Sequence, residues 1–448
     1  MSKSVTKDMT VGSPMRLIVS FFIPLLLGML FQQFYSMMDT IIVGRCLGVN
    51  ALAAVGSTGS VNFMIIGFCM GVCNGFAIPV AQCFGAKDQT GLRKFVANSV
   101  WLSIVFAVIM TIVTCILCRQ IMTWMRTPAD IFEDANTYIF IIFIGIPATY
   151  LYNLVSGIIR SLGDSRSPLF FLIVSSVLNI GLDFLFILTF HMGVAGAAWA
   201  TVISQAVSGI GCLFYMKHKF EILKIRPEEW KMDTKYMKIL CGMGIPMGLQ
   251  YSITAIGSVI LQTAVNTLGS SAVAAITAGS KVSMFFCCPY DAMGSTMATY
   301  AGQNVGAGKL DRVKKGMLSC CLLGLIYAVL AFAFLFFFGR YTALLFMEAS
   351  EKAILGNVTT FLLINSAFFF PLSLVNIIRF TIQGMGYSVL AICAGICEMV
   401  ARSIVGFVFV PMWGFVAACF ASPVAWICAD IFLIPAFFYC LRRLKKVY

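Results

Sequence analysis

The stretch GVNALAA at residues 48–54 returns as GSSAVAA at residues 269–275, so that one glycine and three alanines recur 221 positions later. Other pairs share this offset, namely Gln82 with Gln303, Gly163 with Gly384, Gly193 with Gly414 and Ala197 with Ala418. Pro24 matches Pro246 one residue out of step. A period of about half the chain indicates a structural duplication. In membrane proteins, duplicated halves are typical of transporters whose site lies between the repeats.

The composition places the chain in the membrane class. Hydrophobic residues make up 60% of the 448 positions and charged residues 11%, which is too apolar for a soluble protein. Twelve apolar segments of about twenty residues or more are long enough to cross a bilayer core of about 30 Å. We therefore predict an all-α membrane protein with twelve transmembrane helices in two six-helix repeats. The segments are 17–40, 53–80, 95–117, 137–159, 168–190, 194–215, 238–262, 272–299, 317–338, 354–378, 388–410 and 414–439.

A long polar stretch at 217–237 divides the chain. We predict an N-terminal six-helix lobe at 1–216, a cytoplasmic linker at 217–237 and a C-terminal six-helix lobe at 238–448. The first apolar segment is too long for a signal peptide and lacks a small-residue cleavage pattern, so no cleaved leader is expected. A glycine at every fourth position also predicts a surface for close helix packing. These glycines are Gly67, Gly71 and Gly75.

The basic residues predict the orientation of the chain. With the N-terminus taken as cytoplasmic, 24 of the 31 lysines and arginines fall on cytoplasmic segments, Arg379 among them. Lys281 and Arg402 lie within apolar segments. This asymmetry follows the positive-inside rule and explains the net charge of +13 without a nucleic-acid partner. We expect a multi-pass protein of the cell inner (plasma) membrane with both termini cytoplasmic and the repeats related by a pseudo-twofold axis along the membrane normal.

Ionisable groups within the predicted spans are the candidates for chemistry. A charge at the bilayer centre costs about 3 kcal/mol on insertion scales, so such residues are functional candidates by default. Five acids qualify, namely Asp39, Asp183, Asp291, Glu398 and Asp430. Asp183 is the strongest, because Asn179 lies one helical turn earlier on the same face and offers a hydrogen bond or an oxygen ligand. The alternative is an aspartate neutralised by a structural partner.

Asp39 is expected at a depth similar to that of Asp183, so the two acids can share one cavity. The alternative for Asp39 is an acid at the end of its helix, at the membrane interface. The duplication favours a functional role for Asn179 and Asp183, because the matching positions 221 residues later hold the apolar residues Val400 and Ile404. A feature that the fold itself demanded should appear in both halves.

The second half carries different polar groups. Glu398 and Arg402 are four residues apart, which predicts an ion pair with either a structural role or a role in the substrate path or coupling. Asp291 and Lys281 share one span but lie about 15 Å apart along the helix axis, too far for a direct pair. Asp291 is therefore a candidate for a gate or for a structural group, and Asp430 has no partner that the sequence identifies.

Several motifs together resemble the MATE (multidrug and toxic compound extrusion) family over essentially the whole chain. The stretch from Pro24 through Gln32, Tyr35 and Asp39 to the glycine and alanines of 48–54 resembles the first span of that family. Residues 179–183 (NIGLD) and 302–308 (GQNVGAG) resemble its later signatures. The branch resembled is the prokaryotic one that includes DNA-damage-inducible F proteins, rather than NorM, because Thr254 stands where NorM-like proteins have a sodium-binding glutamate.

This resemblance implies a multidrug antiporter coupled to H⁺ or Na⁺ that exports organic cations or other amphipathic compounds by alternating access. It implies ion coupling, with Na⁺ as one option, at Asp39, Asn179 and Asp183. Neighbouring substrate or coupling positions are Gln32, Tyr35, Tyr138 and Thr201, and Pro24 is implied as a bending point. Asp291, Glu398 and Arg402 stay as polar candidates of the second half. We expect no cofactor, a small-molecule substrate, contact with the lipid bilayer and a monomer.

Two other functions compete with the antiporter. A lipid-linked oligosaccharide flippase of the same superfamily would share the architecture but require a more cationic cavity for pyrophosphate. A membrane-embedded enzyme would require paired acids for a metal, or a histidine, serine or cysteine centre within a span. The first-half candidates are acidic, which disfavours the flippase, and the sequence shows no pattern of the enzymatic kind.

Overall fold

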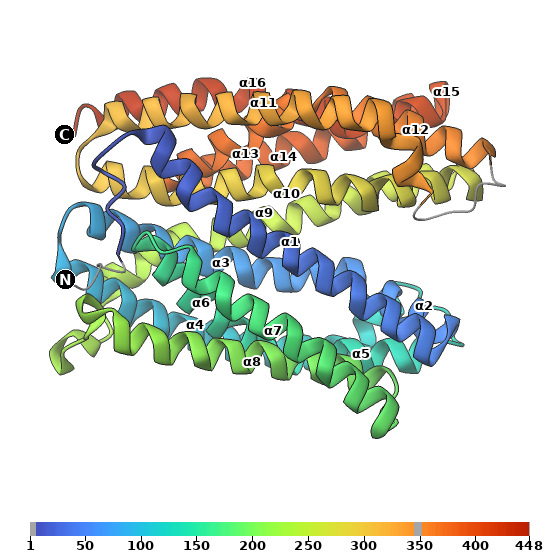
Figure 1. The fold of residues 1–448 in the computed structure, drawn as a ribbon, viewed down its shortest axis with the longest axis horizontal. Helices are drawn as coiled ribbons and strands as arrows, with labels where there is room; N and C mark the ends of the chain where they lie inside the picture. The colour runs from blue at the N-terminus through green and yellow to red at the C-terminus, as the bar shows by residue number, and fades with distance from the viewer. Residues whose placement is uncertain (1–5, 345–351, 448) are drawn as a thin grey trace. The chain divides into compact units, whose positions relative to one another are not determined.

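The computed structural model describes residues 6–344 and 352–447, and these form helices joined by short loops, with no strand among them (Figure 1). The helices are α1 (Pro14–Leu47), α2 (Val49–Ser57), α3 (Gly59–Gly85), α4 (Gln89–Trp124), α5 (Phe132–Ile144), α6 (Ile146–Ser161), α7 (Arg166–Phe184), α8 (Val194–Lys219), α9 (Thr234–Asn266), α10 (Ser270–Gly306), α11 (Leu310–Ala343), α12 (Lys352–Ala367), α13 (Phe369–Gly384), α14 (Ser388–Ile404), α15 (Val410–Trp413) and α16 (Phe415–Leu444). Short helical turns are η1 (Leu185–Thr189), η2 (Glu221–Leu223), η3 (Pro227–Trp230) and η4 (Val405–Phe409).

The number of spans agrees with the hydropathy pattern. Within the described ranges, ten helices are long and apolar enough to cross a membrane. Two further helix pairs qualify together, α5 with α6 at a bend of 45° and α12 with α13 at a bend of 50°. Counting each bent pair as one span gives twelve, as predicted.

The duplication is visible in the backbone as well as in the sequence. Gly193 precedes α8 with φ 61° and ψ −143°, and Gly414 precedes α16 with φ 63° and ψ −139°. Residues with a side chain rarely adopt this conformation, so a glycine is required at the same point of each half. The two bent helix pairs also fall at matching places in the halves. The recurring glycines therefore mark equivalent chain reversals.

The chain forms two compact units. Unit 1 holds the described residues up to Met9 together with Ile23–Tyr251, and unit 2 holds Thr10–Phe22 together with the described residues from Ser252 onward. Helices α1 and α9 are therefore divided between the units, and the linker belongs to unit 1. The lobes predicted at 1–216 and 238–448 are defined by the sequence repeat, whereas the two units are defined by compactness. The predicted lobe bounds stay a prediction.

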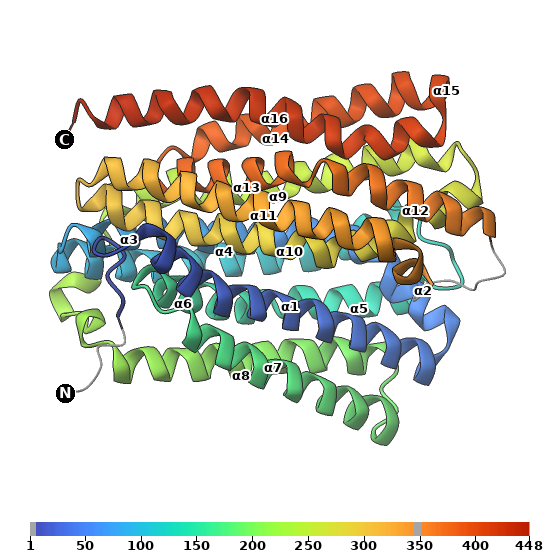
Figure 2. The same cartoon turned by 45° about the horizontal axis from the view of Figure 1, so that its top comes forward.

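Neighbouring helices run side by side within each unit. In unit 1, α7 lies along α8 (Figure 1), and in unit 2, α14 lies along α16 (Figure 2). The predicted glycine surface lies on α3 in unit 1. A Cβ at Gly71 would come within 2.5 Å of the Met247 carbonyl oxygen, and a Cβ at Gly75 within 2.5 Å of Cα of Gly244. The packing role of these glycines is confirmed, because α3 meets the first part of α9 backbone against backbone.

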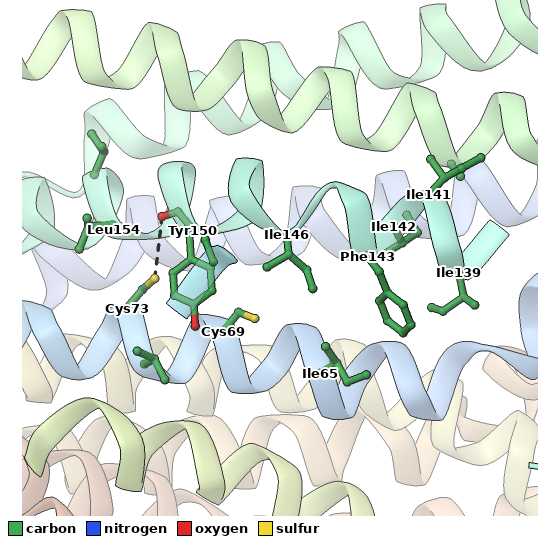
Figure 3. Packing of buried hydrophobic residues seen from close by; sticks show 14 of the residues in the cluster. Ile65, Cys69, Cys73, Ile139, Ile141, Ile142, Phe143, Ile146, Tyr150 and Leu154 are labelled. Carbon is green, nitrogen blue, oxygen red and sulfur yellow. Dashed lines mark hydrogen bonds between the residues drawn. The ribbon is translucent and has the colours of Figure 1, made fainter. Parts of the chain in front are cut away.

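An apolar core between α3 and the bent α5–α6 pair fixes the helices around the candidate site in unit 1. Figure 3 shows side chains from both sides of this core, including Ile65, Cys69 and Cys73 of α3 and Phe143, Ile146 and Tyr150 of α5–α6. The Cys73 thiol donates a long hydrogen bond to the Tyr150 carbonyl, with 3.8 Å between sulfur and oxygen. Close packing of this kind holds side chains on α5 in fixed positions.

The predicted linker is docked on α4. Arg93 on α4 makes a two-pronged ion pair with Glu229, with Nε–Oε2 2.7 Å and Nη2–Oε1 2.8 Å. One residue further along the linker, the Trp230 carbonyl accepts a hydrogen bond from Trp101 Nε1 at 3.0 Å. Both members of the ion pair are buried. The linker is therefore held to unit 1 by side-chain contacts.

We expect Glu229→Gln to lower the free energy of unfolding by about 2 kcal/mol, because it removes a charge-assisted hydrogen bond from a buried pair. The hydrogen bond from Arg93 lowers the pKa of the Glu229 carboxyl. Its stabilisation is therefore present above the unfolded pKa of about 4.3 and is lost as the pH falls through the lower folded value. Thermal unfolding in detergent at several pH values measures both effects.

The control is Glu221→Gln, which alters the exposed pair with Lys224 and should change the free energy of unfolding by less than about 0.5 kcal/mol. An unchanged unfolding temperature for Glu229→Gln would contradict the docking.

Candidate functional site

Helices α1 and α7 bring the predicted acidic residues together within unit 1. Asp39 lies in the last third of α1, and Asn179 and Asp183 lie one turn apart near the end of α7. All three are buried, with relative exposures of 9% for Asp39, 1% for Asn179 and 0% for Asp183. The carboxyl groups of Asp39 and Asp183 lie within hydrogen-bonding reach of each other. The structure therefore brings the two acids together, as the sequence predicts, and their joint role stays a prediction.

The oxygens of this cluster lack donors. Neither carboxyl oxygen of Asp183 receives a hydrogen bond from a described residue, nor do Oδ1 of Asp39 and Oδ1 of Asn179. The Asn179 amide is oriented by its Nδ2, which donates to Thr201 Oγ1 at 3.4 Å. Two adjacent carboxylates in a low-dielectric interior repel each other unless a proton or a cation lies with them. The arrangement can therefore hold a proton between the acids or a small cation among the carboxylate and amide oxygens.

The predicted neighbours line the same cluster. The Tyr35 hydroxyl lies near the side chains of Gln32 and Gln205, and it is close enough to Asp39 and Asp183 to interact with their charges. Tyr138 on α5 interacts electrostatically with the same two acids. Thr201 contacts Asn179 as described above. The four neighbours thus surround one site contributed by α1, α5, α7 and α8.

Two polar residues of this site were not predicted from the sequence. Gln205 on α8 accepts a hydrogen bond from Thr149 Oγ1 at 2.9 Å, besides its contact with Tyr35. A signal for Gln205 was present, because it lies four residues after Thr201 and therefore on the same helix face. Thr149 gave no such signal, because the bend between α5 and α6 separates it from Tyr138 and interrupts the helical spacing.

Pro24 lies inside α1, which is one continuous helix from Pro14 to Leu47. A proline in a helix interior removes one backbone hydrogen bond and weakens the helix locally. The division of α1 between the two units falls at Phe22 and Ile23, beside this proline. Its bending role stays a prediction.

Unit 2 holds a buried ion triad in place of an acidic pair. Glu398 on α14 pairs with Arg402 one turn later, with 3.4 Å between Oε2 and Nη2, so the predicted pair is confirmed. Its other oxygen accepts a hydrogen bond from Arg379 on α13. The charge pattern assigns Arg379 to a cytoplasmic segment, and the structure shows that its side chain is buried rather than exposed at the end of the helix. Helix α13 runs to Gly384, beyond the predicted end of the span at 378, and the Arg379 side chain points into the bundle with 5% exposure.

The other second-half acids lie near the same arginine. Buried Asp430 on α16 and exposed Asp291 on α10 both interact electrostatically with Arg379. Asp291 and Lys281 form no ion pair, as their separation along α10 predicts. The acidic site of unit 1 and the balanced charges of unit 2 are therefore chemically different, although the backbones repeat.

The composition of the unit 1 site differs from that of a dedicated metal-binding site. No group of three or more histidine, cysteine, aspartate or glutamate residues suited to a metal occurs in the described part of the chain. A sodium ion passing through the site would depend on the two carboxylates, the Asn179 amide oxygen and the Thr201 hydroxyl.

Comparison with known proteins gives a consistent result. The family model MatE matches residues 24–185 and 246–410, one match in each half. The chain is 30% identical over 373 residues to the probable multidrug resistance protein YpnP of Bacillus subtilis (strain 168), covering 83% of this chain and 82% of that protein. It is 29% identical over 341 residues to the probable multidrug resistance protein YoeA of the same strain, covering 74% of each. A solved structure of an outward-facing multidrug resistance MATE family transporter superposes with a TM-score of 0.93 at 24% identity and 99% coverage of both chains, which shows the shared fold.

Proposed function

Since this chain belongs to the MATE family of membrane transporters, we propose that it is a cation-coupled antiporter that exports cationic or amphipathic small molecules by alternating access. Members of the family are transporters rather than enzymes, and they need no cofactor. The related YpnP and YoeA carry multidrug resistance names, which supports export of foreign compounds as the physiological role. The comparisons do not favour the oligosaccharide flippase.

The observation that carries this proposal is the pair of buried carboxyl groups of Asp39 and Asp183. In their charged form they attract a positive group, whether a coupling ion or the cationic part of a substrate. A bound proton or cation reduces that attraction and favours release of the substrate. Such competition for one site couples transport of the ion to transport of the substrate, because binding of either ligand lowers the apparent affinity of the protein for the other.

We propose that the first helix transmits this change. Asp39 and Pro24 both lie on α1, and Pro24 is the point where the helix lacks one backbone hydrogen bond. Neutralisation at Asp39 alters how the outer part of α1 packs against α7, and the bend at Pro24 absorbs the movement. Gln32 and Tyr35 lie between the two positions and contact the substrate or the ion.

We propose protons as the coupling ion. The neighbouring carboxyl groups can hold a proton between them without further ligands, whereas a sodium ion also requires the Asn179 and Thr201 oxygens. Thr254 in place of a glutamate supports coupling in the first half and a closer likeness to the DNA-damage-inducible F branch than to NorM.

The distribution of basic residues supports a plasma-membrane protein with cytoplasmic termini, and we propose that it acts as a monomer.

The test is efflux of the fluorescent cation ethidium from proteoliposomes under an imposed proton gradient or an imposed sodium gradient. We expect efflux under the proton gradient, its loss on addition of a protonophore, and no efflux under the sodium gradient alone. Empty liposomes are the control. Efflux under the sodium gradient alone would show that sodium, rather than the proton, is the coupling ion. If folded protein transported no ethidium under either gradient, the proposal would be overturned.

A further inference from the structure

Between residues 277 and 291, one exposed face of α10 in unit 2 carries three polar side chains and one methionine. Exposed side chains recur at spacings of three, four or seven residues and therefore form one stripe on the helix. They are Thr277, Lys281, Met284 and Asp291. Asp291 lies close to the middle of α10, well inside a helix that is long and apolar enough to span the membrane.

The neighbouring helix of the same unit shows what a lipid-facing stripe looks like in this chain. Between residues 318 and 338, every exposed side chain of α11 is apolar, and these side chains recur at the same kind of spacing. They include Leu318, Leu322, Leu325 and Val329, each at least 40% exposed. An aspartate or lysine exposed to hydrocarbon at mid-helix is strongly disfavoured, and such residues face a water-filled cavity instead. The stripe on α10 therefore borders water rather than lipid.

The surroundings of Asp291 suit a positively charged ligand. Asp291 interacts electrostatically with Arg379, but that guanidinium is held by Glu398 in the buried triad. Lys281 on the same stripe lies about 15 Å away along the helix axis. The Asp291 side chain itself is exposed and can reach a ligand in the water-filled space. Met284 lies two turns earlier on the same stripe with 52% exposure, and its flexible thioether can contact apolar groups of varied shape.

We infer that Asp291 binds the positive group of a transported organic cation on a water-filled path along α10, with Met284 in contact with the apolar body of that cation. This inference rests on the proposed function for the class of substrate. It adds a substrate-binding carboxylate in unit 2, separate from the acidic pair of unit 1.

The first test is whether the stripe faces water. Thr277→Cys and Met284→Cys on α10 are compared with Leu322→Cys and Val329→Cys on α11, using a charged, membrane-impermeant methanethiosulfonate reagent on protein in lipid nanodiscs. Peptide mass spectrometry separates the new thiols from native ones such as the exposed Cys46. We expect the α10 cysteines to react at least about tenfold faster, because a charged reagent is excluded from hydrocarbon. Equal rates on the two helices would overturn the inference.

The second test is equilibrium binding of tetraphenylphosphonium to the purified protein without any gradient. We expect Asp291→Asn to weaken binding about tenfold, the effect of losing one charged contact. The control is Asp311→Asn, which removes the same charge from unit 2 at an exposed position paired with Lys445. It should bind tetraphenylphosphonium like the unmodified protein. Unchanged binding by Asp291→Asn would overturn the assignment. If the unmodified protein itself bound no tetraphenylphosphonium, the cationic substrate would be wrong, even where labelling still showed a water-facing stripe.

Discussion

Asp183→Asn is expected to reduce proton-driven efflux of ethidium by about 100-fold, the upper range of coupling energies between two ligands on one protein. Asp183 is fully buried beside Asp39, and neither of its oxygens receives a hydrogen bond from a described residue. An amide at this position keeps the shape but carries no charge and binds no proton. The remaining acid no longer has a partner with which to share the proton, so substrate and proton movement become uncoupled. The initial rate of efflux from proteoliposomes measures the effect.

The matched control is Asp430→Asn, which removes another buried intramembrane acid at 7% exposure but lies in unit 2 beside Arg379. We expect that variant to retain coupled transport. Size-exclusion chromatography of both variants separates loss of coupling from loss of fold. Efflux by Asp183→Asn at the unmodified rate would remove this residue from the mechanism and direct attention to Asp291.

Glu398→Gln is expected to destabilise the protein by about 3–5 kcal/mol, the range found when one partner of a buried ion pair is removed. Glu398 forms ion pairs with two arginines at once, Arg379 on α13 and Arg402 on α14, and all three side chains are less than 10% exposed. Without the carboxylate, two positive charges face each other in a low-dielectric interior. A large fall in the thermal unfolding temperature in detergent is the expected result.

The control for this variant is Glu133→Gln, whose ion pair with Arg119 is exposed, at 70% for Glu133 and 65% for Arg119. It should change the free energy of unfolding by less than about 0.5 kcal/mol. The measurement also decides between the two roles that the sequence left open for Glu398. Unchanged stability combined with loss of transport would favour a role in the substrate path over the structural one.

The sequence by itself determined the class of the protein and the identity of its acidic candidates. Apolar segments of sufficient length predict spans because each helix in a membrane satisfies its own backbone hydrogen bonds. The offset between Gly193 and Gly414 predicted equivalent chain reversals, which both adopt the same backbone conformation. The pairing of Asn179 with Asp183, like that of Glu398 with Arg402, followed from the helical period. All of these features depend on residues near one another in the chain or on its repeat.

The tertiary structure decided which distant side chains meet. Asp39 lies beside Asp183, and Gln205 beside Tyr35, only because α1, α7 and α8 pack together. The sequence places Arg379 among the exposed basic residues at a span end, whereas helix packing buries its side chain against Glu398. Hydropathy reports how apolar a segment is, but helix packing determines which face of each helix meets another helix and which is left exposed.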